Sequence, residues 1–193
     1  MQTLATERLI IRPLTKQDKA LYITLYTDAK VMRNICPPLN KHAAEQLFES
    51  SLKQLDRFNN KRLSWVLIEK ASQQAIGIQG ITWDQGDSET ISIGIMLTRS
   101  ANGKLIPEEA MGALIEYSFK HLKINKINAE YQKINLATAR FVKKLGFIAG
   151  AVREEDENQD CHMQVQHIKQ NYITEIITEI AKEEKSLVAV SVD

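Results

Sequence analysis

The spacing of apolar residues changes along the chain, and each spacing predicts a different element. Residues 9–14 form a short apolar run that predicts a strand, closed by Pro13 because proline cannot donate to a sheet ladder. Thr15 and Asp18 then have the residue types that begin a helix, a capping hydroxyl and a carboxylate in the positive first turn. Apolar positions at helical spacing follow, which predicts one helix before the Pro37-Pro38 pair and one after it.

The middle of the chain changes to the alternation of strands. Residues 63–69, 75–83 and 89–97 are three such runs with short turns between them, which predicts an antiparallel meander. After residue 97 helices and strands alternate. The predicted elements are a helix at 107–123, a strand at 126–132, a helix at 136–145 ended by Gly146, and a hairpin of 147–152 with 161–168.

This order of elements predicts an α/β (α+β) protein with a mixed, mostly antiparallel sheet. A length of 193 residues suits one domain, which we place at residues 1–170. Residues 171–193 carry Ile176, Ile177 and Ile180, and they are predicted to form an appended C-terminal helix or tail whose last residues fray.

Composition narrows the function classes. The chain is 44% hydrophobic and 25% charged with a net charge of +1, which is ordinary for a soluble protein and gives no reason to expect a nucleic-acid partner. The N-terminus does not have the pattern of a signal peptide, and no apolar run reaches the roughly 18 residues of a membrane span. We therefore expect a cytoplasmic protein without a membrane partner.

The cysteines and histidines predict no metal site. Cys36 and Cys161 are far apart and are expected to be reduced, packed thiols. The four histidines are scattered without the spacing of metal ligands, at positions 42, 121, 162 and 167.

The segment from Thr98 to Lys104 has the composition of an anion site. It follows a predicted strand and precedes a predicted helix, whose first amides have no partner inside the helix. Gly103 permits unusual backbone angles, and Arg99 and Lys104 offer positive charge for phosphates. The segment matches neither the Walker nor the dinucleotide pattern, and an ordinary Asn-Gly turn explains its spacing equally well.

Longer runs, in their order, resemble a known family. Residues 6–14, 76–81, 93–97 and 135–147 are similar to the opening, the third strand, the fourth strand and the most specific run of the GNAT superfamily of N-acetyltransferases. The likeness is closest to the RimJ/RimL-like branch, which acetylates ribosomal-protein N-termini and related small amines. It covers about residues 4–170, which a single chance motif does not produce.

The resemblance implies a sheet of about seven strands, splayed between the fourth and fifth, with acetyl-coenzyme A in the wedge. It implies transfer of an acetyl group to a primary amine, on a protein N-terminus or a small molecule, by a monomer or homodimer without a metal. The residues that it places at the cofactor are Ile95, Met96, Leu97, Asn102, Gly103, Lys104, Leu105, Ile106, Pro107, Asn135, Thr138 and Phe141.

Direct transfer needs a base for the amine, donors for the thioester oxygen and a proton for the departing thiolate. Backbone amides near residues 95–97 are the expected donors. Thr138 is a candidate acid or a plain helix-surface hydroxyl, and Glu89 is a candidate base or a solvated glutamate at a strand end. Asn135 lies near the pantetheine arm by resemblance, and it also has the residue type that caps a helix.

Three departures from the family pattern favour an alternative. The phosphate-loop frame Gln/Arg-x-x-Gly-x-Gly/Ala places Leu105 and Pro107 where small residues are usual. Ser92 stands where many relatives carry a glutamate, and Gln164 where they often carry a tyrosine. A catalytically weakened acyl-coenzyme A-binding or regulatory module is therefore the second interpretation.

Overall fold

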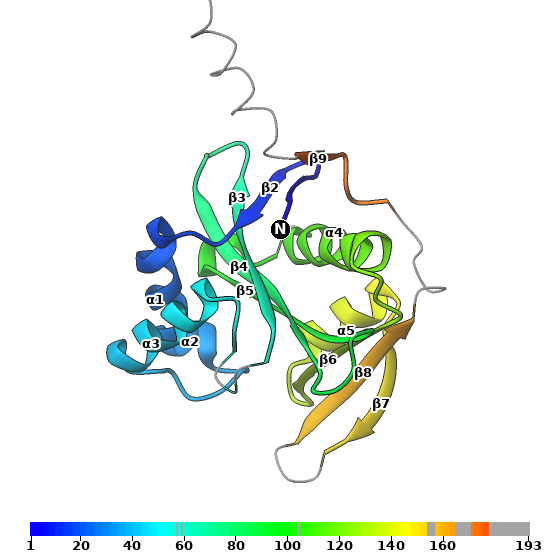
Figure 1. Ribbon diagram of the computed structural model, residues 1–193. Coiled ribbons are helices and arrows are strands. Elements are labelled where there is room, and N and C mark those ends of the chain that lie inside the picture. The colour runs from blue at the N-terminus through cyan, green and yellow to red at the C-terminus, as the bar shows by residue number, and fades with distance from the viewer. Residues whose placement is uncertain (57, 59, 104, 154–156, 165–170, 178–193) are drawn as a thin grey trace, which may run out of the picture.

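The computed structural model describes residues 1–56, 58, 60–103, 105–153, 157–164 and 171–177. These residues form one nine-stranded sheet in the order β7-β8-β6-β5-β4-β3-β2-β1-β9 (Figure 1). Its strands are β1 (Thr3–Ala5), β2 (Leu9–Pro13), β3 (Arg62–Glu69), β4 (Ala75–Trp83), β5 (Thr90–Leu97), β6 (Lys126–Gln132), β7 (Ile148–Val152), β8 (Asn158–Gln164) and β9 (Glu175–Ile177). Neighbouring strands are antiparallel except β5 and β6, which are parallel.

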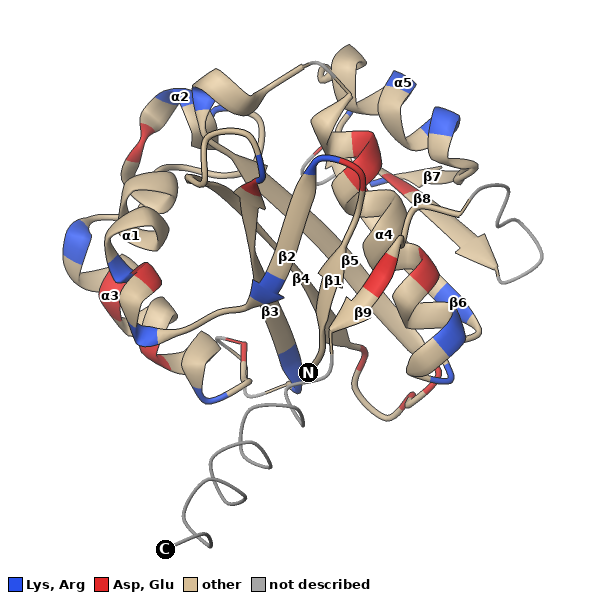
Figure 2. Cartoon of the chain, turned by 90° about the horizontal axis from the view of Figure 1, so that it is seen from above, with Lys and Arg blue, Asp and Glu red and all other residues tan. Residues whose placement is uncertain are grey.

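Helices cover both faces of the sheet. Figure 2 shows α1 (Lys19–Thr27), α2 (Ala29–Met32) and α3 (Lys41–Leu52) on one side, and α4 (Ile106–His121) and α5 (Leu136–Leu145) on the other. Each side has its own core. Tyr22 and Phe48 pack on the α1–α3 face, and Trp65 of β3 and Leu114 of α4 belong to the core of the other face. The two faces of the sheet are therefore covered by separate sets of helices, each with its own core.

Local signals in the sequence fix several element ends. Asp18 accepts hydrogen bonds from Thr15 N (2.8 Å) and Thr15 Oγ1 (2.9 Å) at the turn that leads into α1. Asn40 Oδ1 caps α3 by accepting from Ala43 N (2.9 Å). Gly146, with φ of 98°, ends α5 in the left-handed conformation that glycine adopts without strain. The predicted helix start at Thr15 and the predicted end at Gly146 are confirmed, whereas the Asn40 cap was not predicted and α3 ends at Leu52, before the predicted end near Phe58.

The predicted strands correspond to β2 through β8, and the structure adds two short strands at one edge of the sheet. The prediction of a helix from Thr174 is wrong for Glu175–Ile177, which is β9 and pairs with β1. Two contacts draw the segment to that edge: Thr174 N donates to Ala5 O (2.8 Å), and the Glu116 carboxylate of α4 accepts from Tyr172 N (2.6 Å). The rest of the predicted helix, residues 178–193, lies outside the described residues, as do residues 165–168 of the predicted hairpin.

Candidate active site

The parallel pair β5 and β6 separates along its length. The two strands pair only at Thr90↔Lys126, Ile91↔Ile127 and Ser92↔Asn128. Beyond that point β5 continues beside β4 as far as Leu97, and β6 continues beside β8 as far as Gln132. The sheet is therefore splayed between β5 and β6, as the resemblance implies, with a closed end at Ser92–Asn128 and an open end at Leu97 and Gln132.

One edge of β5 faces this wedge. Thr98 N donates to Ile76 O (2.8 Å) and Asp84 N donates to Thr90 O (3.3 Å), so the even-numbered residues of this region bond to β4. Strand backbones alternate, and the N–H and C=O groups of Ile93, Ile95 and Leu97 therefore point into the wedge.

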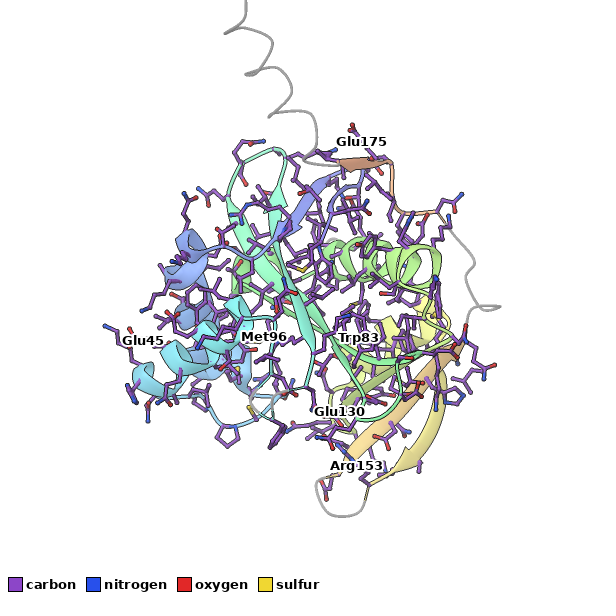
Figure 3. All side chains as sticks on the ribbon, viewed as in Figure 1. Glu45, Trp83, Met96, Glu130, Arg153 and Glu175 are labelled. Carbon is purple, nitrogen blue, oxygen red and sulfur yellow. The ribbon has the colours of Figure 1, made fainter. Side chains whose placement is uncertain are left out.

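The three predicted cofactor-binding residues on β5 therefore differ in the direction of their backbone groups. Ile95 and Leu97 direct backbone groups into the wedge, whereas Met96 bonds toward β4. The Met96 side chain is buried in the core on the α1–α3 side (Figure 3). An extended ligand with amide groups can pair along this edge as an additional strand does.

The loop after β5 leads directly into α4 at the open end. A 3-10 turn at Arg99–Ala101 is followed by Asn102 and Gly103, both exposed, and Gly103 has φ of 91°. Leu105 precedes the helix with φ of 61°, a left-handed conformation that is unfavourable for a side chain with a Cβ. Lys104 lies outside the described residues.

The first amides of α4 are only partly available to an anion. Ile106 N donates to Gly103 O (3.2 Å), and Glu109 N donates to Leu105 O (3.1 Å). Pro107, the second residue of the helix, has no N–H. The loop therefore has the position of a phosphate site but fewer free donors than a glycine-rich loop would offer.

The positive charge of Arg99 is paired with Asp28 and not left free for a phosphate. Its Nε and Nη2 atoms donate to Asp28 Oδ2 at 3.1 and 2.7 Å, and the same carboxyl group caps α2 through Lys30 N (2.8 Å). The hydrogen bond from Arg99 is the main reason that the pKa of Asp28 is lowered. The ion pair ties the loop after β5 to the α1–α3 side, which the sequence did not indicate.

Glu109 fixes the first turn of α4 from the opposite direction. This buried carboxylate accepts from Thr6 Oγ1 (2.5 Å), Arg8 N (2.7 Å) and Arg8 Nε (2.6 Å). Burial favours the neutral acid, but the hydrogen bonds from Thr6 and Arg8 outweigh it and lower the pKa of Glu109. The start of α4 is therefore held against the turn between β1 and β2.

The first turn of α5 also lies at the open end, because α5 starts four residues after β6 ends. Asn135 Oδ1 accepts from Thr138 N (3.2 Å), which confirms the capping interpretation of Asn135. Thr138 is half-buried, and Phe141 packs against the core beneath α4. The predicted site residues of α5 therefore approach the wedge from the α4–α5 side.

Glu89 is placed at the closed end. It is exposed, its Oε2 accepts from Asn125 Nδ2 (2.6 Å), and its carbonyl accepts from Lys126 N (3.2 Å). These contacts join β5 and β6 just before their first paired residues, Thr90 and Lys126. With a rise of about 3.3 Å per residue, Glu89 is about 10 Å along the strand from Ser92.

Asp84 was not predicted from the sequence. It follows β4, is half-buried, and bridges the two strands of the wedge: Ser92 Oγ donates to its Oδ1 and Asn128 Nδ2 to its Oδ2, both at 3.2 Å. No local signal marks it, because Asn128 is 44 residues away.

Comparisons with known proteins agree with this geometry. The sequence matches the acetyltransferase (GNAT) domain family over residues 8–148. An uncharacterized N-acetyltransferase of Bacillus licheniformis is 29% identical over 154 residues, which cover 76% of this chain and 83% of that protein. A solved GNAT-family acetyltransferase from Bacillus anthracis has a TM-score of 0.71 at 18% identity, covering 84% of this chain and 98% of that one.

A second solved structure has the same degree of likeness. Spermidine N-acetyltransferase from Vibrio cholerae, in complex with CoA and spermine, gives a TM-score of 0.71 at 16% identity, over 83% of this chain and 98% of that chain. The chain therefore belongs to the GNAT family, and it is an acetyltransferase of the GNAT type. Within the described residues, no helix combines the length and the apolar character needed to cross a membrane.

Proposed function

We propose that the protein transfers an acetyl group from acetyl-coenzyme A directly to a primary amine, on a protein N-terminus or a small molecule. The observation that carries this proposal is the separation of β5 from β6 beyond Ser92 and Asn128, which exposes a strand edge inside the sheet. The residue runs that resemble the RimJ/RimL-like branch support a place in that branch. The Vibrio cholerae relative, whose structure contains spermine, supports a test of polyamines beside peptides.

The residues of the chain have separate tasks in this reaction. The loop from Asn102 to Pro107 would hold the diphosphate at the open end. The backbone groups of Ile93, Ile95 and Leu97 would pair with the amides of the pantetheine arm, and their N–H groups would stabilise the thioester oxygen as charge develops there.

The first turn of α5 closes the same end of the wedge. Asn135 and Phe141 would line the arm from the α4–α5 side. Thr138 Oγ1 would give the departing thiolate its proton, with the hydroxyl held by a capped and therefore ordered helix start.

A non-catalytic module is the second candidate, and the phosphate loop favours it. Leu105 is in a left-handed conformation, Pro107 lacks an amide hydrogen, and Arg99 is paired with Asp28. Each of these reduces what the loop offers to a diphosphate. A module of this kind would bind acyl-coenzyme A weakly and would not turn over.

Calorimetry and thiol release distinguish an active acetyltransferase from a non-catalytic module. We expect coenzyme A and acetyl-coenzyme A to bind in isothermal titration calorimetry. We also expect free thiol to be released when spermidine or a peptide with a free N-terminal alanine is added. Binding without release for any amine would favour the module, and no binding at millimolar concentration would exclude both.

A variant of Thr138 tests the assigned acid. Thr138→Ala should lower kcat by about 100-fold, the lower part of what proton transfer contributes, and should leave acetyl-coenzyme A affinity unchanged. Thr138→Ser keeps the hydroxyl and should retain activity. Equal rates for all three proteins would remove Thr138 from the mechanism.

A further inference from the structure

Asp84 lies at the apex of the wedge. Ser92 and Asn128, the last paired residues of β5 and β6, both donate to its carboxylate, one to each oxygen. This carboxylate therefore spans the two strands at the point where they part.

The thioester would lie between the open end and the apex, because the length of the pantetheine arm separates it from the diphosphate. The proposed diphosphate site follows Leu97 at the open end, so a pantetheine arm that pairs with Leu97, Ile95 and Ile93 in turn runs toward Ser92. Gly94 leaves open space on the α1–α3 face beside this path, because a Cβ at residue 94 would meet no atom of the described residues within 4 Å, apart from its chain neighbours. An amine can reach the apex over this position.

Building on the proposed function, we infer that Asp84 is the group that accepts the proton of the acceptor amine. The nitrogen lone pair forms the bond to the thioester carbon, the C–S bond breaks, and its electrons leave with the sulfur. The ammonium ion loses two protons: one goes to a carboxylate oxygen of Asp84 before the attack, directly or through one water, and frees the lone pair, and the other goes to solvent as the amide forms. The thiolate takes a proton from Thr138 or solvent, so an ammonium ion and a thioester give an amide, a thiol and one released proton.

Among the residues that the structure describes, the charged groups around this carboxylate do not provide an equivalent acceptor. Asp87 lies in the same turn and accepts from Glu89 N (2.8 Å) and Thr90 N (3.1 Å), so its carboxylate closes the turn. Glu89 is bonded to Asn125 behind the apex. Glu130, farther along β6, is paired with Arg153 (Figure 3).

The nearby lysines interact with residues other than Asp84. Lys61 Nζ lies 4.1 Å from the ring centroid of Trp83, and the charge of Lys126 adds to the hydrogen bonds from Thr90 and Glu89 that lower the pKa of Asp87. Among the described carboxylates, Asp84 is thus the one at the apex, where the neutral side chains of Ser92 and Asn128 orient its two oxygens.

The test compares pH profiles of kcat/KM for Asp84→Asn and the wild type, with whichever of spermidine and the alanine-ended peptide the wild type acetylates. We expect the variant to be about 100-fold slower at pH 7. The deficit should shrink by about tenfold per pH unit up to the pKa of the amine, about 10 for spermidine and about 8 for the peptide N-terminus, because without a base only the neutral fraction of the amine reacts. Acetyl-coenzyme A affinity should not change in calorimetry.

Three further variants make the result decisive. Asp84→Glu keeps a carboxylate and should keep the wild-type profile, and Asp84→Ser provides the same test if the amide disturbs the turn. Asp87→Asn removes an equal charge from the same turn, and its amide oxygen can still accept the backbone bonds, so kcat/KM should stay near that of the wild type.

The outcomes distinguish this inference from the proposal on which it rests. Full activity of Asp84→Asn, or a deficit that does not vary with pH, overturns the role of Asp84 while the acetyltransferase activity stands. A wild-type protein that binds acetyl-coenzyme A but acetylates neither amine overturns both.

Discussion

The ring of Tyr172 lies on the backbone of Gly112, so closely that a Cβ at residue 112 would be 2.4 Å from Tyr172 Cε2. Glycine in the middle of a helix costs about 1 kcal/mol relative to alanine, so its presence in α4 has a packing reason. The close contact lets the segment that leads to β9 lie flat on α4. It complements the hydrogen bonds from Tyr172 N and Ile173 N to the Glu116 carboxylate.

Gly112→Ala should therefore destabilise the protein in spite of its better helix propensity. Overpacking of this kind costs about 1–3 kcal/mol. In a Tyr172→Ala background the same substitution should instead stabilise the protein, by about 1 kcal/mol. Urea denaturation of the four proteins measures the cycle, and additive effects would show that Tyr172 does not rest on α4 in solution.

Leu105 has a backbone conformation that its side chain makes unfavourable. A left-handed conformation costs a residue with a Cβ about 1–2 kcal/mol, and glycine adopts it freely. Leu105→Gly should leave stability unchanged or raise it by up to about 1 kcal/mol, because the greater flexibility of the unfolded chain offsets part of the gain.

Leu105→Gly should also increase coenzyme A affinity, since an exposed leucine would no longer stand beside the phosphates. Gly103→Ala, at φ of 91°, is the matched control and should act in the opposite direction. Isothermal titration of coenzyme A measures both. Weaker binding by Leu105→Gly would mean that the leucine side chain itself contacts the ligand.

Glu109 should make stability depend on pH in the acid range. Its pKa is lowered by folding, so its contribution is complete above the unfolded value, near 4.5, and is lost as pH falls through the folded value. Glu109→Gln should cost about 1.5–3 kcal/mol at pH 7, the range for hydrogen bonds to a charged group. The difference from the wild type should narrow below pH 4.5. Urea denaturation at pH 7 and pH 3.5 measures it, and a constant difference would show that the charge of Glu109 is not what stabilises the fold.

The parts of the fold that could be predicted are those fixed by local sequence. The bounds of β4 and β6 were predicted without error because alternation and flanking turn residues define them within a few positions. The start and end of α5 follow from Asn135 and Gly146 in the same way. Even the wedge was expected, although from the order of family-like runs and not from periodicity.

The parts that could not be predicted depend on contacts between distant residues. The isoleucines near residue 176 fit a helix as well as a strand, and the contacts of the segment with Ala5 and Glu116, both distant in sequence, favour the strand. Arg99 was expected near phosphates, but Asp28, far away in sequence, is its partner. Asp84 becomes a candidate only when β4, β5 and β6 are side by side. Sequence therefore predicted the wedge, but not the partners of the charged groups around it.

Gln79 provides the last test, because it is buried without a hydrogen-bond partner. It lies on β4 between Trp65 and Ile95, with 3% of its surface exposed, and neither its Nε2 nor its Oε1 has a partner among the described residues. An unsatisfied buried polar group costs about 1–3 kcal/mol. Gln79→Met has a similar volume without the amide, and it should raise the free energy of unfolding by about that amount. Gln46→Met, at an exposed position of α3, should have little effect. Urea denaturation of both variants measures this, and a less stable Gln79→Met would mean that buried water bonds to the amide in solution.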